Sequence, residues 1–208
     1  MTREELIYKV RVKIEELSPY GDGSFVNTGG LVKPITATID DILDETCNEV
    51  LQQLPLYVID SADFSNEPVT MTSERTGFVD LPNDFLRLHA FKMASWKREV
   101  SVPITKQNPL YALQHNPYTM GGVINPVCVL NTYGGKKVLE YYSVPKHIEH
   151  EVVKAEYIKR FDQYNIQESI VNAYTLRCAG KVFGVFGKPN EKTLIDKEYE
   201  LLLQTYII

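Results

Sequence analysis

The stretch from residue 76 to residue 96, TGFVDLPNDFLRLHAFKMASW, decides the fold because its apolar residues alternate instead of recurring at helical spacing. Residues 78–81 alternate as in a short strand, and the apolar residues of the next strand share one face: Leu86, Leu88 and Ala90. Between the two strands, Pro82 lacks a backbone N–H and so stops the pairing of the first. We therefore expect two strands separated by a tight corner at residues 80–84.

The strand region continues beyond this stretch. Val100, Val102 and Ile104 alternate and predict a third strand with these residues on one face. A long connection follows at residues 105–126, with one expected helical turn at residues 109–114.

A β-hairpin is predicted over residues 128–144, because Gly134 and Gly135 can supply the positive φ angles that a tight turn requires. Alternation then returns at Val153, Ala155 and Tyr157, which predicts a last strand.

Helical spacing precedes the strand region. Thr2 and Glu5 fit a capping box at the start of a first helix over residues 2–17, in which apolar residues recur at Leu6, Val10, Ile14 and Leu17. A Gly-rich connection follows at residues 18–34. A second helix is expected from Thr36 or Thr38 to Leu54, with Cys47 inside its apolar stripe and Pro55 at its end. The acidic group Asp40, Asp41, Asp44 and Glu45 is interpreted as favouring the positive end of this helix's macrodipole.

Helical spacing also returns after the strands. One helix is expected over about residues 166–186, and a final helix is expected after the break at Gly187-Lys188-Pro189, with Asn190 as its N-cap. The glycines in AGKVFGVFGKP, residues 179–189, are too widely spaced for a phosphate-binding loop, so Gly180 and Gly184 are interpreted as allowing close helix contact or ending the helix.

This order of elements predicts an α+β fold. Strands and helices are not interleaved, which argues against a doubly wound α/β sheet. We expect a helical bundle built from both chain ends, residues 1–67 and 161–208, with an inserted antiparallel β region at residues 68–160 that includes the hairpin.

Composition limits the function classes. The 208-residue chain has a formal net charge of −5 and no basic patch, so tight binding to nucleic acid is not expected. No apolar run reaches the length of a membrane span, and the start MTREELIYKV is charged, unlike a signal peptide. The three isolated cysteines predict reduced core thiols in a cytoplasmic setting.

Few residues suggest chemistry. His147 and His150 lie three residues apart but have no third ligand at recognisable spacing, so no metal site is expected, and His89 is expected at the surface or in an interface. We expect no cofactor and no enzymatic activity. If an unrecognised active site exists, the cluster to consider is Tyr141, Tyr142, His147 and Glu149.

The order and spacing of these segments across most of the chain resemble a known family. The helical pair with its long loop, the segment VDLPNDFLRL at residues 79–88, the hairpin and the segment IQESIVNAYTLRCAGKVFGVFGKP at residues 166–189 are similar to head-to-tail connector proteins of tailed bacteriophages. These are the adaptor or ring proteins beneath the portal, and the chain resembles podovirus-type tail adaptors and the ring proteins of crAss-like phages.

The resemblance implies a ring, commonly of twelve copies, that docks on the portal, contacts neighbouring copies and a tail or further ring proteins, and lets DNA pass through its lumen without specific binding. It implies a virion location at the portal–tail junction and the host cytoplasm during assembly, with no membrane. The corner at residues 80–84 would then turn the chain at the junction of bundle and sheet, and Phe85 would seal that junction.

The residues expected at interfaces are apolar and lie in the two long connections, in the hairpin, after the corner and at the chain end: Phe25, Val26, Leu31, Trp96, Tyr118, Met120, Tyr133, Tyr206, Ile207 and Ile208. Two alternatives stay open for them. A buried anchor of the sheet is the simpler interpretation of Trp96, and the last three residues can equally finish the final core helix. A non-ring assembly or stopper module of a phage is the alternative function, and an enzyme is a further one.

Overall fold

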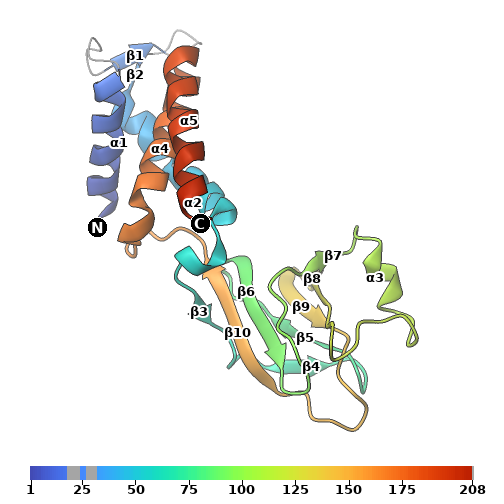
Figure 1. Ribbon diagram of the computed structural model, residues 1–208. Helices are drawn as coiled ribbons and strands as arrows, with labels where there is room; N and C mark the ends of the chain where they lie inside the picture. The colour runs from blue at the N-terminus through green and yellow to red at the C-terminus, as the bar shows by residue number, and fades with distance from the viewer. Residues whose placement is uncertain (18–23, 27–31, 208) are drawn as a thin grey trace. The chain divides into compact units, whose positions relative to one another are not determined.

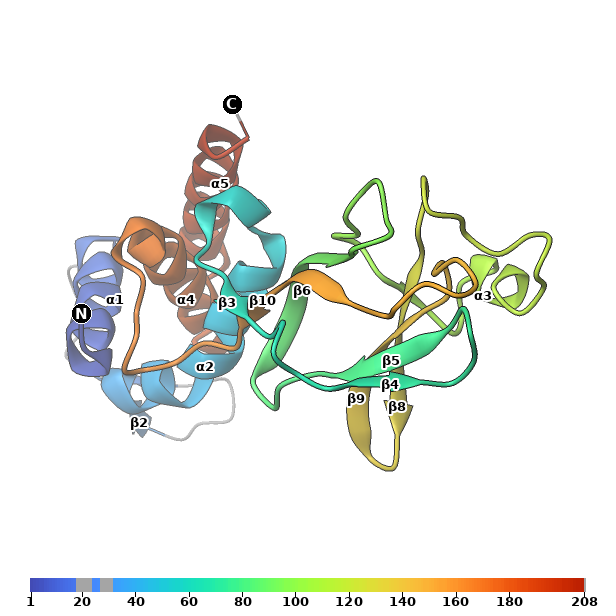
Figure 2. The same ribbon diagram turned by 90° about the horizontal axis from the view of Figure 1, so that it is seen from below.

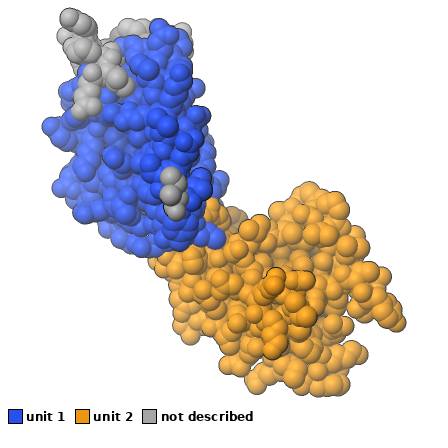
Figure 3. All heavy atoms as spheres, in the orientation of Figure 1, with its two compact units in different colours: residues 1–60, 160–208 blue, residues 61–159 orange. Residues whose placement is uncertain are grey.

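The computed structural model describes residues 1–17, 24–26 and 32–207 (Figure 1). It contains both helices and sheets, which confirms the expected α+β class. The chain divides into two compact units, residues 1–60 with 160–208 and residues 61–159 (Figure 3). We call them the helical unit and the β unit. No helix of the described residues is long and apolar enough to cross a membrane.

The helical unit contains helices from both ends of the chain. Its long helices are α1 (Arg3–Leu17), α2 (Ile35–Gln53), α4 (Val171–Val185) and α5 (Pro189–Thr205). Two short 3₁₀ helices, η1 (Leu56–Val58) and η2 (Glu168–Ile170), and a pair of antiparallel strands, β1 (Ser24–Val26) and β2 (Val32–Pro34), complete it. Helix α4 contacts α1, α2 and α5 and is therefore the central element of this unit (Figure 1).

The predicted start of the first helix is confirmed. The backbone N–H of Glu5 donates to the Thr2 hydroxyl at 3.2 Å, and the backbone N–H of Thr2 donates to the Glu5 carboxylate at 2.8 Å. This reciprocal pair satisfies two N–H groups that the first turn would otherwise leave unpaired. The apolar side chains of Leu6, Val10 and Ile14 are completely buried.

The interpretation of the acidic group in α2 is wrong. The helix begins at Ile35, earlier than expected, and its first turn contains no acidic residue. Instead, the Arg3 side chain donates to the Asp40 carboxylate at 2.8 Å and to the Asp40 carbonyl at 3.1 Å, and it also pairs with Asp44. Two of the acidic residues thus hold α1 against α2.

Close contact between the last two helices explains Gly180. A Cβ atom at this position would lie 2.9 Å from the Asp196 carboxylate and 3.3 Å from Ile195 on α5. The predicted N-cap Asn190 is wrong: α5 begins at Pro189, and Lys188 occupies the cap position. Proline is favoured at the first helical position because its φ is already helical and its missing N–H is not needed there.

The β unit contains two sheets (Figure 2). The three-stranded sheet has the order β3 (Ala62–Asp63), β10 (Val152–Lys159), β6 (Phe85–Met93). The five-stranded sheet has the order β4 (Val69–Met71), β5 (Gly77–Asp80), β9 (Lys136–Tyr141), β8 (Cys128–Tyr133), β7 (Ile104–Thr105). A single-turn helix, α3 (Leu110–Leu113), confirms the helical turn expected in the second long connection.

The tight corner is confirmed, and its expected place at a bundle–sheet junction stays a prediction. It joins β5 of the five-stranded sheet to β6 of the three-stranded sheet, and the Phe85 N–H donates to the Pro82 carbonyl at 3.0 Å. Phe85 lies in the core of the β unit, where its ring stacks on Tyr157 with centroids 5.9 Å apart. The corner therefore turns the chain from one sheet to the other.

The hairpin is confirmed, with φ angles of 56° at Gly134 and 84° at Gly135. The strand at residues 152–159 is also confirmed, although a register shift between Val152 and Lys154 leaves Val153 half exposed. The third predicted strand is wrong. Val100 forms an isolated antiparallel bridge with Phe91, Val102 is exposed, and a strand forms only at Ile104 and Thr105, which pair in parallel with β8. Pro103 breaks the run because it cannot donate a ladder hydrogen bond.

Candidate functional site

Trp96 belongs to the core of the β unit. Only 2% of its surface is exposed, its indole N–H donates to the Ser143 carbonyl at 3.2 Å, and its ring meets Phe91 edge-on at 5.8 Å. The alternative of a buried anchor is therefore the one that the structure supports, and the expectation of an interface aromatic at this position is wrong.

The other expected interface residues are spread over both units. Phe25 and Val26 form part of β1, and Leu31 and Ile208 lie outside the described residues. In the β unit, Tyr118 is almost completely exposed, Met120 is partly buried and Tyr133 is half exposed. These three belong to the second long connection and the adjoining hairpin, so this part of the β unit is the first candidate surface.

The end of α5 is a second candidate surface. The Tyr206 hydroxyl donates to the Ser169 carbonyl at 3.2 Å, and partial burial raises the pKa of Tyr206. Ile207 follows with 72% of its surface exposed. Tyr206 is thus hydrogen-bonded to η2 while Ile207 faces solvent, and docking of this chain end on a partner stays a prediction.

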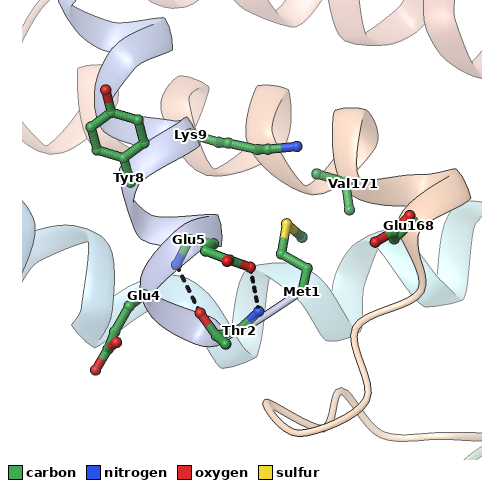
Figure 4. A pocket seen from close by; sticks show the side chains of 8 residues that line it. All are labelled: Met1, Thr2, Glu4, Glu5, Tyr8, Lys9, Glu168 and Val171. Carbon is green, nitrogen blue, oxygen red and sulfur yellow. Dashed lines mark hydrogen bonds between the residues drawn. The ribbon is translucent and has the colours of Figure 1, made fainter.

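A groove lies in the helical unit between the first turns of α1 and the segment η2–α4 (Figure 4). Its volume is about 860 Å³. The lining combines apolar side chains with carboxylates and one amine: Met1, Thr2, Glu4, Glu5, Tyr8, Lys9, Glu168 and Val171. Figure 4 shows that the hydrogen bonds among these residues are those of the capping box, so Glu5 serves the start of the helix.

A buried carboxylate organises the base of the hairpin. Glu140 on β9 is 4% exposed and accepts hydrogen bonds from Asn131 at 2.5 Å, from the Tyr142 hydroxyl at 2.7 Å and from the Tyr133 hydroxyl. Its hydrogen bond and its charge oppose ionisation of the neighbouring phenol and raise the pKa of Tyr133 to about 12. The tyrosines satisfy a buried charge, which is a structural role.

The structure does not bring the suspected enzymatic cluster together. Tyr141 and Tyr142 are adjacent on and after β9, but the Tyr141 hydroxyl pairs with His150 at 2.7 Å and the Tyr142 hydroxyl pairs with Glu140. His147 and Glu149 are exposed.

The other histidines have structural partners. His150 is buried, and its second ring nitrogen lies 3.0 Å from the Glu74 carbonyl. His89 is partly buried and pairs with Glu156 at 2.8 Å across β6 and β10. Within the described part of the chain, no group of three or more His, Cys, Asp or Glu side chains is placed to hold a metal ion.

Several exposed residues of the first candidate surface were missed by the sequence analysis. Val102, Leu110, Leu113 and Ile124 expose between 42% and 79% of their surface. A signal was present in the sequence: the 36 residues from Val100 to Gly135 contain one charged side chain, Lys106, in a chain whose residues are 24% charged. We call residues 100–135 the neutral segment.

Comparison of the sequence with models of known protein families finds no match, and neither does comparison with curated protein sequences.

Proposed function

We propose that this chain is a structural virion protein of a tailed bacteriophage, which forms a ring of twelve copies beneath the portal, joins the capsid to the tail and lines the DNA exit channel. The observation that carries the proposal is the order of the elements. Helices from both ends of the chain pack in one unit, and the β unit of residues 61–159 is inserted between them. A helical bundle from both chain ends with an inserted β region is the architecture implied by the resemblance to connector proteins.

The charge of the chain also supports the proposal. A net charge of −5 disfavours phosphate contacts, which suits a channel wall along which DNA must move without being held. The proposed partners are the portal, neighbouring copies and a tail or further ring protein, and the proposed locations are the virion and, during assembly, the host cytoplasm.

The test is the copy number of this protein in purified phage particles, measured by quantitative mass spectrometry with isotope-labelled standard peptides. The portal and major capsid proteins serve as internal references. A ratio to portal subunits near one supports a portal-matched ring. A protein present at a much lower ratio is a stopper or assembly module, and a protein absent from particles is not a connector.

A further inference from the structure

The neutral segment differs from the rest of the chain in its charge. If its 36 residues had the 24% charged content of the whole sequence, about nine would be charged, whereas only Lys106 is. The segment contains β7, α3, β8 and the tip of the hairpin, and α3 contacts β7, which pairs with β8. The lack of charge therefore belongs to one part of the β unit.

The neutral segment also exposes large apolar side chains. Six are at the surface: Val102 (79%), Leu110 (48%), Leu113 (42%), Tyr118 (96%), Ile124 (61%) and Tyr133 (45%). Some exposed apolar residues elsewhere stand directly next to charges, as Tyr8 does beside Lys9 and Leu201 beside Glu200. Single exposed apolar residues are ordinary surface, whereas six of them in a segment with one charged residue are a candidate interaction surface.

Buried polar groups hold the neutral segment in place. Gln114 is 3% exposed; its amide group donates to the Leu110 carbonyl at 3.0 Å and accepts from the Gly121 N–H at 2.9 Å. The Ser143 hydroxyl donates to the Gly121 carbonyl at 2.8 Å, and the Lys97 N–H donates to the Val123 carbonyl at 2.8 Å. A surface that is already ordered loses less conformational entropy when it binds.

Aromatic contacts fix the helical turn as well. The rings of Tyr111 and His115 meet edge-on at 4.7 Å, and the ring of His115 lies 5.8 Å from that of Tyr142. Because the Tyr142 hydroxyl is bonded to the buried Glu140, α3 is joined to the five-stranded sheet through side chains. The exposed leucines of α3 are thus displayed on a fixed support.

We propose that the neutral segment is the surface through which one copy of this chain docks on a second copy. Two copies that each carry a net charge of −5 repel each other, and this repulsion is weaker at a contact made by a segment that has no acidic residue than at a contact between acidic surfaces. The exposed apolar side chains supply the area that such a contact buries, with Tyr118 as its aromatic anchor. The inference rests on the proposed ring, whose neighbouring copies it would join.

The experiment is sedimentation velocity of the full chain from about 5 μM to about 500 μM, a range that detects dissociation constants weaker than 1 μM. The wild-type weight-average mass should rise with concentration. Tyr118→Glu places a charge in the contact and should weaken association by about tenfold or more. Tyr164→Glu is the matched control, because Tyr164 is 86% exposed but lies in the helical unit, and it should associate like the wild type.

Salt gives a second readout. Raising NaCl from about 0.05 M to about 0.5 M screens the repulsion between copies, so association through the neutral segment should stay equal or strengthen, whereas an interface made of ion pairs would weaken. If Tyr118→Glu perturbs the fold, as judged by Trp96 fluorescence, Leu110→Ser combined with Leu113→Ser replaces it.

Three results would overturn the inference: a wild-type monomer over the whole range, equal association of the Tyr118 and Tyr164 variants, or association that salt abolishes. None of them bears on whether the protein occurs in particles at a portal-matched ratio. Failure of the docking surface and failure of the proposed function are therefore distinguishable.

Discussion

Gly77 in β5 has no room for a side chain. It pairs with Tyr141 on β9 and with Met71 on β4. A Cβ atom at this position would lie 2.2 Å from the Tyr141 hydroxyl and 2.6 Å from the Thr70 carbonyl oxygen. Atoms cannot remain at these distances, so Gly77→Ala must displace either a buried ring or the backbone of β4.

Moving the Tyr141 ring would break buried contacts that stabilise the β unit. It is completely buried, its hydroxyl is 2.7 Å from His150, and it stacks on Phe91 at 6.4 Å. Overpacking of a core costs about 1–3 kcal/mol, and loss of a buried hydrogen bond adds about 1–3 kcal/mol. Gly77→Ala should therefore lower the free energy of unfolding by about 2–5 kcal/mol.

Urea unfolding followed by Trp96 fluorescence measures this effect, because the chain's only tryptophan lies in the core of the β unit. Gly122→Ala is the control: no atom lies within 4 Å of its Cβ position, so its effect should stay within about 0.5 kcal/mol. A cost below about 1 kcal/mol for Gly77→Ala, or equal costs for both variants, would refute the packing argument. In the double variant, Tyr141→Phe should relieve part of the clash, giving a coupling energy of at least about 0.5 kcal/mol.

Other perturbations test single features. Tyr133 has a pKa of about 12 in the folded protein, against about 10 when unfolded, so its contribution to stability is complete below pH 10 and disappears as the pH rises through 12. A titration followed at 295 nm should lose a step near 12 in Tyr133→Phe, and a lost step near 10 would contradict this. Arg3→Ala should lower the free energy of unfolding by no more than about 1 kcal/mol, because its partners Asp40 and Asp44 are more than half exposed. In thermal unfolding, the loss should be smaller at high salt than at low salt, because salt screens the ion pairs. An equal loss at both salt concentrations would contradict the ion-pair explanation. The three free cysteines are buried, so a thiol reagent should label them in denaturant but not in native buffer. Deletion of residues 205–208 should abolish incorporation into particles and leave folding intact, whereas loss of folding would mean that these residues complete the core.

Local signals allowed part of the fold to be predicted from the sequence. The capping box joins residues three apart, the hairpin turn depends on Gly134 and Gly135, and the corner depends on Pro82. In each case the residues that determine the geometry are neighbours in the chain. Their effect on the backbone does not depend on what packs against them.

The wrong predictions concern residues whose burial or pairing depends on partners far away in the sequence. Trp96 is buried because it meets Ser143, 47 residues away, and the acidic residues of α2 are explained by Arg3 on another helix. The sequence also does not predict which side chains of the neutral segment are exposed. Cys128 is completely buried and Tyr118 is 96% exposed, although both are surrounded by uncharged residues. The sequence shows that charge is sparse there, but only the tertiary structure separates core from surface.

The pairing of β3 with β10 has a consequence for how such a chain can be rebuilt. Ala62 lies opposite Tyr157 and Asp63 lies opposite Glu156, so the polypeptide enters and leaves the β unit side by side. An insert with adjacent ends can be removed or exchanged with only a short linker to close the gap. Residues 61–159 therefore have the geometry of an exchangeable inserted domain. A single recombination event can replace the whole β unit with another domain while the sequences of the flanking helices stay unchanged.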